Sequence, residues 1–549
     1  MAKIARLIGG AGTGKTTELL RIMDGALEQL GDDPLRLGFA SFTRAARAEA
    51  AGRAASAWGV SERLLTREGW FRTVHSTAMR CIGVAAGQLL TETKEDVAWL
   101  SEALGVKVSS HYDDETGGVK FVGDPTVAAS LNCWALCRSS LIPLSTIVSR
   151  ARSIDDNVPD FAAIVRVAEH YETAKNLDDR LDFTDLLMRF AGLGMDTQEG
   201  PYKKEEEGDL PMVDAWLFDE QQDASPLLDA VCKRLVSAPS VKWCYVVGDP
   251  FQAIYGFAGS SADCFLAWNA SKERTMPKSW RCPKPIADLG ERCLRRMYRG
   301  YFDRKIAPAD HEGSVSEFGS IEQAASLIDP NDSWLLIART NFQATRMHAA
   351  MCEAGKPAKW TTSPDGPTAK AIGMQALYAL EKGEPITAVQ WMRAMELLPQ
   401  VNKTKEKILV RGTKAKWKNS EESQRWDLIF PSELQEVGAT ESLVNALASG
   451  EWVGLVDGGK QWRRQAERWG SELTAEPKVR VGTIHSVKGA EADNVALLTT
   501  TSNRVDAGND DALQHDEECR IAYVGVTRTR RNLYVINEGR PGTPRMEVL

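Results

Sequence analysis

The feature that most restricts the fold of this chain is the glycine-rich stretch LIGGAGTGKTT at residues 7–17. Its part GGAGTGKT, residues 9–16, places four residues between a glycine and Gly-Lys-Thr. Residues 5–8 are apolar enough for a buried strand, so the pattern predicts a strand, a phosphate-binding loop and a helix that begins at Lys15. The alternative is an ordinary strand, turn and helix cap, which does not require Lys-Thr after the last glycine.

Each residue type in this loop has a role in binding a nucleotide. Backbone N–H groups surround phosphate oxygens, Lys15 neutralises the β- and γ-phosphates, and the Thr16 hydroxyl holds Mg²⁺. The predicted phosphate-binding residues are Gly9, Gly10, Ala11, Gly12, Thr13, Gly14, Lys15, Thr16 and Thr17. The loop indicates a nucleotide without indicating which reaction uses it.

Composition limits the class of protein. A length of 549 residues predicts about three or four domains. Apolar runs stay short of the roughly 20 residues of a membrane span, and the N-terminus shows no signal-peptide core, so we expect a soluble, cytoplasmic protein without a membrane partner. The ten scattered cysteines are interpreted as reduced thiols. A net charge of −8 excludes a wholly basic nucleic-acid coat but permits a locally basic channel.

A second nucleotide signature, AWLFDEQQDAS, occupies residues 215–225. A short apolar run ends in Asp219 and Glu220, where a parallel strand would meet its loop. Asp219 at this place can hold Mg²⁺, and Glu220 can polarise the attacking water. A solvated acidic loop is the alternative interpretation.

The stretch WCYVVGDPFQAIYGF, residues 243–257, repeats this design with an apolar run and a Gly-Asp-Pro break. Gln252 is placed to sense the γ-phosphate or the water. Tyr255 and Phe257 could stack on bases, although aromatic side chains belong more often to a core.

Taken in order, these motifs resemble those of a superfamily 1 DNA helicase of the UvrD/Rep/PcrA type. The further segments that carry the resemblance are FASFTRAARAEAAGR at 39–53, TVHSTAMR at 73–80, LDFTDLL at 181–187, SWRCP at 279–283, VRVGTIHSVKGAEADNVALL at 479–498 and IAYVGVTRTRRNLYVI at 521–536. The resemblance covers most of the chain.

The resemblance implies roles for individual residues. Arg281 and Arg528 match arginines that reach the γ-phosphate from a second core domain, which gives the catalytic set Lys15, Asp219, Glu220, Gln252, Arg281 and Arg528. Glu491 of the KGAE segment matches the position that contacts the ribose, and Gly489 of the same segment is an implied cofactor-binding residue. The implied residues of a single-stranded DNA groove are Phe42, Thr43, His75, Ser76, Tyr255, Phe257, Thr483 and His485. A hydrogen-bonded loop residue is an equal alternative for His75.

The resemblance also implies the architecture, an α/β fold with two RecA-like P-loop core domains and helical insertion domains. The expected segments are 1–88 (core 1A, first part), 89–180 (helical insertion 1B), 181–276 (core 1A, second part), 277–358 (core 2A, first part), 359–476 (insertion 2B) and 477–549 (core 2A, second part). Residues 161–177 show apolar positions at helical spacing. The basic stretch at 403–418 could grip duplex phosphates, with a solvated face as the alternative, and the Pro- and Gly-rich tail at 539–549 is expected to fray.

We therefore expect an ATP-dependent, Mg²⁺-requiring helicase or translocase that moves on single-stranded or tailed duplex DNA, with 3′ to 5′ polarity implied by the resemblance. One alternative is a DNA-dependent ATPase without unwinding that acts beside a partner nuclease. A remote alternative is a P-loop kinase or other NTPase. Relatives read adenine with a glutamine upstream of the phosphate loop, but few residues precede the loop here, so weak selectivity for ATP over GTP is expected.

Overall fold

The computed structural model describes residues 2–113, 118–155, 157–363, 369–418, 427–469, 476–508, 511–539, 543–546 and 549. The chain divides into two compact units. Apart from the last two residues, unit 1 comprises Met1–His311 and Arg504–Thr527, and unit 2 comprises Glu312–Asn503 and Arg528–Glu547. The boundaries expected for the core and insertion domains stay a prediction. Residues 364–366 of insertion 2B and residues 540–542, 547 and 548 of the tail lie outside the described residues.

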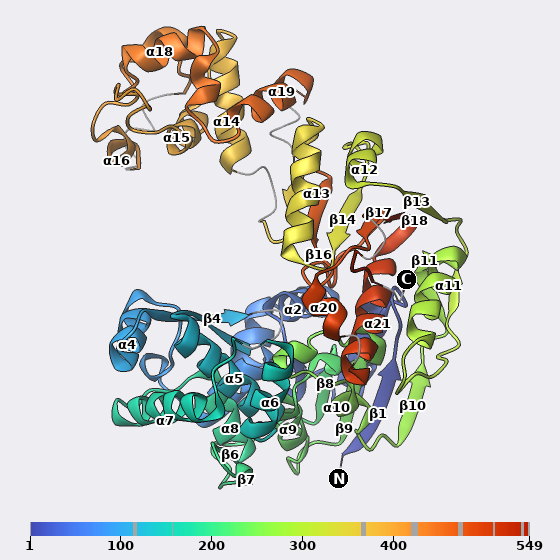
Figure 1. Cartoon of the computed structure of the whole chain (residues 1–549). Coiled ribbons are helices and arrows are strands. Elements are labelled where there is room, and N and C mark those ends of the chain that lie inside the picture. The colour runs from blue at the N-terminus through green and yellow to red at the C-terminus, as the bar shows by residue number, and fades with distance from the viewer. Residues whose placement is uncertain are drawn as a thin grey trace. The chain divides into compact units, whose positions relative to one another are not determined.

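Unit 1 is built on a six-stranded parallel sheet with the order β10-β1-β9-β8-β2-β3 (Figure 1). Its strands are β1 (Lys3–Ile8), β2 (Leu37–Ser41), β3 (Trp70–Thr73), β8 (Ala215–Phe218), β9 (Trp243–Gly248) and β10 (Lys272–Thr275). The strands expected before the glycine loop, before Asp219 and before Gly-Asp-Pro are thus present. Because the strands are parallel, the residues that follow them gather at one edge of the sheet.

Helices lie between successive strands of this sheet. They are α1 (Lys15–Gln29), α2 (Arg44–Trp58), α3 (Val74–Ile82), α8 (Phe183–Ala191), α9 (Pro226–Val236) and α10 (Ala262–Leu266). Unit 1 also contains α11 (Lys284–Arg295) and α21 (Ala512–Val526), which follow the sheet in the chain. The hydroxyls of Thr43 and Thr73 accept the N–H groups of Ala46 and Ser76, which caps α2 and α3 directly after β2 and β3. A short parallel pair, β11 (Lys278–Pro283) and β12 (Ala307–Ala309), completes the unit.

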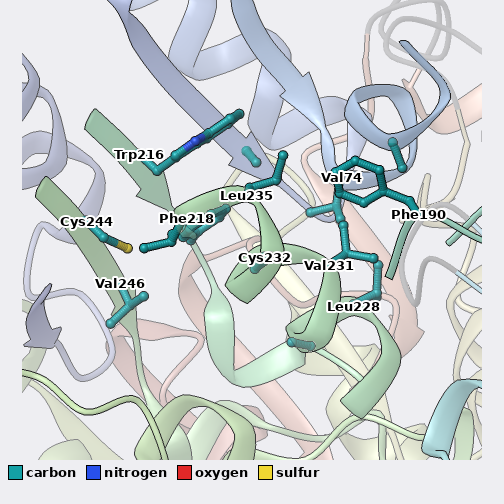
Figure 2. Packing of buried hydrophobic residues seen from close by; sticks show 14 of the residues in the cluster. Val74, Phe190, Trp216, Phe218, Leu228, Val231, Cys232, Leu235, Cys244 and Val246 are labelled. Carbon is teal, nitrogen blue, oxygen red and sulfur yellow. The ribbon is translucent and has the colours of Figure 1, made fainter. Parts of the chain in front are cut away.

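The apolar core on one face of this sheet fixes the strands that carry the acidic motifs. Figure 2 shows Trp216 and Phe218 of β8 and Cys244 and Val246 of β9, with side chains from α9 among the other labelled residues. The rings of Trp216 and Phe218 stack with centroids 5.7 Å apart. Both side chains are fully buried, so this core anchors β8 immediately before Asp219.

A mainly helical insertion lies between α3 and α8. It contains α4 (Lys94–Leu104), β4 (Val108–Asp113), β5 (Gly118–Gly123), α5 (Pro125–Ser140), α6 (Leu144–Ile154) and α7 (Phe161–Leu177). The helix expected from the spacing at residues 161–177 has those same bounds. The insertion has its own apolar core, and the strands β4 and β5 form an antiparallel hairpin. A second hairpin, β6 (Leu193–Asp196) and β7 (Gly200–Lys203), follows α8.

Unit 2 contains another six-stranded parallel sheet, with the order β13-β18-β17-β14-β16-β15. Its strands are β13 (Ser314–Phe318), β14 (Trp334–Ala338), β15 (Lys359–Trp360), β16 (Val479–Thr483), β17 (Ala492–Leu498) and β18 (Thr529–Ile536), and its helices near the sheet are α12 (Ile321–Leu327) and α13 (Asn341–Glu353). The helix α20 (Asn503–Gly508) belongs to unit 1 except for its first residue. Regular strand structure returns at Val479, as expected. The two parallel sheets confirm the predicted α/β fold with two RecA-like domains.

Between β15 and β16 the chain forms a helical group with its own apolar core. The group consists of α14 (Ala369–Glu381), α15 (Ala388–Leu397), α16 (Thr413–Lys418), α18 (Glu441–Ala448) and α19 (Gly459–Trp469). These helices are drawn together in yellow to orange in Figure 1. In the part of the chain that the structure describes, no helix combines the length and apolar character needed to cross a membrane.

Candidate nucleotide-binding site

The glycine loop follows β1 at the carboxyl edge of the unit 1 sheet and leads into α1, which begins at Lys15. Gly12 and Gly14 have φ values of 67° and 82°, in the left-handed region that favours glycine. A Cβ atom at Gly12 would also lie 2.2 Å from the Cβ of Arg281. Both the backbone conformation and this close approach therefore require glycine at position 12.

Neighbouring groups hold the outer side of the loop. The Ala11 N–H donates to the Tyr523 hydroxyl at 3.1 Å, and the Ser279 hydroxyl donates to the Ala11 carbonyl at 2.8 Å. The Trp280 N–H donates to the Gly12 carbonyl at 2.8 Å. Within the loop, the Thr13 hydroxyl donates to the Gly10 carbonyl at 2.9 Å. These bonds fix the loop before the first turn of α1, whose N–H groups have no partner inside the helix.

Lys15 lies beside the acidic pair at the end of β8. Its Nζ is 3.9 Å from Oε1 of Glu220, and Asp219 is buried. Burial and the neighbouring Glu220 charge raise the pKa of Asp219 to about 7. A divalent cation beside Asp219 would favour its ionised form, and carboxylate and hydroxyl oxygens are ligands that Mg²⁺ accepts, so Asp219 and Thr16 fit the predicted metal role chemically.

Glu220 has a backbone conformation that is uncommon for a residue with a side chain. Its φ is 51°, its N–H donates to Oδ1 of Asp219 at 2.9 Å, and its Oε2 accepts from Nε2 of Gln222 at 2.5 Å. Such left-handed conformations persist where the surrounding structure over-determines them, often at functional sites. The side-chain bond from Gln222 holds the Glu220 carboxylate in place.

Asp249, the aspartate of Gly-Asp-Pro, is a hub that the sequence analysis did not single out. It is fully buried, and Gln252 donates to its Oδ2 from Nε2 at 2.8 Å. Arg304 and Tyr523 also donate to its carboxylate, at 2.7 Å and 3.2 Å. The Asp–Pro break signalled a loop at this position, but no local pattern marks Arg304 or Tyr523 as its partners.

The two predicted γ-phosphate arginines fall in different units. Arg281 belongs to unit 1, where its Nη1 donates to the Thr527 carbonyl at 3.3 Å. Arg528 belongs to unit 2 and is almost fully buried, and its Nη1 donates to the Ala490 carbonyl at 3.4 Å. The catalytic assignment of both arginines stays a prediction.

Unit 2 also holds the KGAE segment. Gly489 is exposed with a φ of 86°, and Glu491 accepts a hydrogen bond from Nε of Arg530 at 2.9 Å. At the end of β16, upstream of KGAE, the Thr483 hydroxyl accepts the N–H of Ser486 at 3.2 Å. His485 lies in the turn between them and is half-buried.

The predicted DNA-contacting residues of unit 1 differ in exposure. Phe42, His75 and Tyr255 are buried, whereas the Phe257 ring is 60% exposed and meets the Tyr255 ring edge-on. Burial lowers the pKa of His75 to about 4, and its ring packs edge-on against Phe183. The exposed Phe257 is therefore the aromatic side chain of this set that presents most surface.

An arginine cluster lies beside the remaining two members, Thr43 and Ser76. Arg72 of β3 donates to the Ser76 hydroxyl at 3.0 Å. Burial, followed by the charges of Arg80 and Arg47, lowers the pKa of Arg72. The charges of Arg80 and Arg47 thus lie close enough to Arg72 to repel it, and the Arg80 side chain lies at the start of β3, where it donates to the Gly69 and Glu68 carbonyls. A local group of cations such as this one is compatible with a negative net charge.

The basic stretch at residues 403–418 lies in the helical group of unit 2. Its exposed cationic residues are Lys403, Lys405, Lys407, Arg411 and Lys416. Lys414 instead donates to the Leu398 carbonyl at 2.6 Å, and the Lys418 side chain lies outside the described residues. Much of the stretch therefore presents charge to solvent.

Known proteins match much of this chain in sequence. Residues 2–273 match the UvrD/REP helicase N-terminal domain, and residues 465–539 match the UvrD-like helicase C-terminal domain. The ATP-dependent DNA helicase UvrD2 of Mycobacterium bovis is 25% identical over 442 residues, which is 73% of this chain and 58% of the relative. RecBCD enzyme subunit RecB of Mycobacterium tuberculosis is 29% identical over 166 residues, covering 28% of this chain and 14% of the relative.

A probable DNA helicase II homolog of Mycoplasma capricolum is 25% identical over 301 residues, which is 53% of this chain and 39% of the relative. The matched regions thus make up 58%, 14% and 39% of the lengths of these relatives, less than two thirds in each case.

Proposed function

We propose that this chain, which belongs to the UvrD/REP helicase family, hydrolyses ATP in response to single-stranded DNA and uses the energy to move along it. The observation that carries the proposal is the approach of the Lys15 ammonium to within 3.9 Å of the Glu220 carboxylate, at the ends of β1 and β8, two strands of one parallel sheet that are separated by β9. A phosphate-binding lysine beside a carboxylate suits a triphosphate and its attacking water.

In this proposal, the loop N–H groups and Lys15 bind the phosphates, and Thr16 and Asp219 would hold a Mg²⁺ ion, which neutralises charge on the phosphate oxygens. Glu220 accepts the proton of the attacking water, and Gln252 orients the water or the γ-phosphate. Arg281 and Arg528 stabilise charge on the transferring group, because a guanidinium is permanently charged and planar. Glu491 contacts the ribose, and Gly489 belongs to the nucleotide-binding residues.

The DNA-binding part of the proposal is supported by charge and exposure. The arginine cluster of Arg47, Arg72 and Arg80 can bind backbone phosphates, and the exposed Phe257 ring can stack on a base without sequence preference. Thr43, Ser76, Thr483 and His485 supply hydroxyl and ring groups for phosphate positioning. Membership of the family supports 3′ to 5′ movement.

The first test measures ATP hydrolysis by the full chain with and without single-stranded DNA. We expect strong stimulation by DNA and a requirement for Mg²⁺. The variant Lys15→Ala should lose hydrolysis while keeping most of its affinity for single-stranded DNA, because the lysine charge acts on the phosphates. A rate of ATP hydrolysis that does not depend on DNA would favour a P-loop kinase or other NTPase. An unchanged rate for Lys15→Ala would refute the assignment of the nucleotide site.

A second candidate function is a DNA-dependent motor that does not unwind duplexes itself and acts beside a partner nuclease. The match to RecBCD enzyme subunit RecB favours its consideration. Duplexes with 3′ or 5′ single-stranded tails distinguish the two candidates. Opening of the 3′-tailed duplex by the isolated chain supports the helicase and its polarity, whereas ATP consumption without strand separation supports the motor subunit.

Both candidates allow the basic stretch at residues 403–418 to bind duplex phosphates ahead of the single strand. Replacing Lys403, Lys405 and Lys407 by Ala should weaken binding to a tailed duplex more than binding to a single strand. If this variant binds the tailed duplex and the single strand each as tightly as the wild type does, the stretch is only a solvated surface.

A further inference from the structure

The Asp249 carboxylate is fully buried and is saturated with donors in unit 1. It accepts from the Phe251 N–H at 3.2 Å, from Gln252 Nε2 at 2.8 Å, from Arg304 Nη1 at 2.7 Å and from the Tyr523 hydroxyl at 3.2 Å. A carboxylate offers about four acceptor positions, so these donors leave Asp249 with one defined orientation. Whatever holds Asp249 therefore also sets the orientation of the Gln252 amide.

Hydrogen bonds extend from this hub to both other parts of the candidate site. On one side, the Tyr523 hydroxyl accepts the Ala11 N–H of the glycine loop at 3.1 Å. On the other side, the Asp249 N–H donates to Oε1 of Gln222 at 3.0 Å, and Nε2 of Gln222 donates to Glu220 at 2.5 Å. One continuous chain of hydrogen bonds thus joins the phosphate loop to the predicted catalytic carboxylate.

Arg304 and Tyr523 can hold the hub because their own states are fixed. Burial raises the pKa of Tyr523, so its hydroxyl stays protonated and can donate to Asp249 while accepting from Ala11. Burial disfavours the Arg304 charge, but the Asp249 carboxylate more than offsets this and keeps the arginine pKa above its ordinary value. The guanidinium also lies 4.6 Å from the Phe251 ring centroid and 5.0 Å from that of Tyr523.

We propose that Arg304 and Tyr523 are positioning residues for ATP hydrolysis, which hold Asp249 so that Gln252 meets the γ-phosphate or the attacking water in a productive orientation. The inference rests on the proposed function and adds two residues that contact no nucleotide in it. Because Tyr523 also binds the Ala11 N–H, the position of the glycine loop and the orientation of Gln252 are set together.

The test is a double-mutant cycle on the full chain. The single variants are Tyr523→Phe and Gln252→Ala, and the third variant combines the two. Tyr523→Phe removes only the hydroxyl group. The kcat of each is measured at saturating ATP, Mg²⁺ and single-stranded DNA. We expect Tyr523→Phe to lower kcat by roughly tenfold to a hundredfold, the cost of a small misplacement of a reacting group. In the Gln252→Ala background the same change should cost less than about threefold, because residues that act through one another are not additive.

Tyr171→Phe is the matched control. The Tyr171 hydroxyl is also buried and donates to a buried aspartate, Asp182, at 3.1 Å, in the helical insertion. The variant Tyr171→Phe should lower the thermal unfolding temperature about as much as Tyr523→Phe does, and it should leave kcat unchanged. If Tyr523→Phe fails to fold, Arg304→Lys, which keeps the charge but loses the planar fork, takes its place in the cycle.

The outcomes separate the two proposals. A wild-type chain without DNA-stimulated hydrolysis overturns the proposed function and this inference together. If the wild type is active, two results overturn only the positioning role. In one, Tyr523→Phe leaves kcat unchanged. In the other, Tyr523→Phe lowers kcat by the same factor with and without the Gln252 side chain. A large cost that disappears in the Gln252→Ala background supports it.

Discussion

Unit 1 contains two buried clusters of the same three residue types, and they differ in what surrounds them. In the Asp249 cluster, Asp249 accepts from Arg304 and Tyr523 at distances of 2.7 Å and 3.2 Å. In the Asp182 cluster, Asp182 accepts from Arg138 at 2.6 Å and from Tyr171 at 3.1 Å. Both satisfy a buried negative charge with a guanidinium and a phenol.

The Asp182 cluster carries more charge and connects three helices. Lys175 joins Arg138 as a second cation, and Glu172 and Asp185 join Asp182 as further carboxylates. The three carboxylates lie close enough together to suit a metal ion geometrically. Arg138 and Lys175 already occupy their oxygens, however, and the contacts tie α5, α7 and α8 to one another.

The comparison shows that a buried Asp–Arg–Tyr arrangement does not by itself identify a functional site. The groups beyond the cluster decide its role. Asp249 is bonded to Gln252 and, through Tyr523, to the glycine loop, so its orientation affects nucleotide chemistry. Asp182 caps α8 by accepting the Asp185 N–H at 2.8 Å, so its orientation affects helix packing.

The largest expected effect is on the Asp249 cluster. Arg304→Met leaves a buried carboxylate without its cation, and breaking such a pair typically costs about 4 kcal/mol of the free energy of unfolding. Urea unfolding of the full chain measures this loss, and the folded fraction should have lost nearly all DNA-stimulated hydrolysis. Arg304→Lys should be less destabilised. A stable and active Arg304→Met variant would show that the cluster is not a hub.

The sequence could predict the residues of this site that follow strands, and it could not predict the residues that hold them. The glycine loop, Asp219 and Gln252 each stand directly after an apolar run, so a local pattern locates them at the edge of the sheet. Arg304 and Tyr523 are separated from Asp249 by 55 and 274 residues, and either reads as an ordinary polar or core side chain. Only tertiary structure brings them together.

The same limit applies to the fold. The strands before the glycine loop, before Asp219 and before Gly-Asp-Pro follow from hydrophobic patterning, as does the helix at residues 161–177. The two-domain architecture follows from the resemblance, and the structure confirms the two-sheet α/β fold. The hairpin β4–β5 inside the helical insertion was not expected, because its residues include few strand-forming alternations. The burial of Phe42, His75 and Tyr255 likewise depends on neighbours distant in sequence, such as Phe183 beside His75.

A smaller loss is expected in the Asp182 cluster. Lys175→Met removes one of two cations, and Arg138 still compensates part of the carboxylate charge, so the free energy of unfolding should fall by about 3 kcal/mol. The folded fraction should hydrolyse ATP at the wild-type kcat. A specific loss of kcat in this variant would contradict the division between a positioning cluster and a structural one.

The excess of carboxylates in the Asp182 cluster predicts a pH effect on stability. Burial and the Asp182 charge raise the pKa of Asp185 from 3.8 to about 6. The folded protein therefore binds more protons than the unfolded chain between these values, and the contribution of Asp185 is present at low pH and lost as pH rises through about 6.

Urea unfolding of the wild type and of Asp185→Asn, compared from pH 4 to pH 7, isolates the contribution of Asp185 to the free energy of unfolding. The stability of the wild type relative to the variant should fall by roughly 2 kcal/mol as pH increases. The variant keeps a carbonyl oxygen that can accept the Asp182 N–H, so the cap of α8 is retained. A difference that does not change with pH would show that Asp185 titrates normally and that the cations fully compensate the cluster.

The smallest effect is expected for an ion pair outside both clusters, and it tests whether burial is the cause of the others. Lys284 Nζ lies 2.8 Å from Oδ2 of Asp288 on α11, with the two side chains 74% and 50% exposed. Lys284→Ala should change the free energy of unfolding by no more than about 0.5 kcal/mol, and less at high salt, because water and ions screen an exposed pair. The lysine also stands at the helix N-terminus, where its charge opposes the helix dipole, so its removal has a compensating benefit. Suppose that Lys284→Ala lowers the free energy of unfolding as much as Lys175→Met does. The contribution of an ion pair to stability would then not depend on its burial, in either cluster.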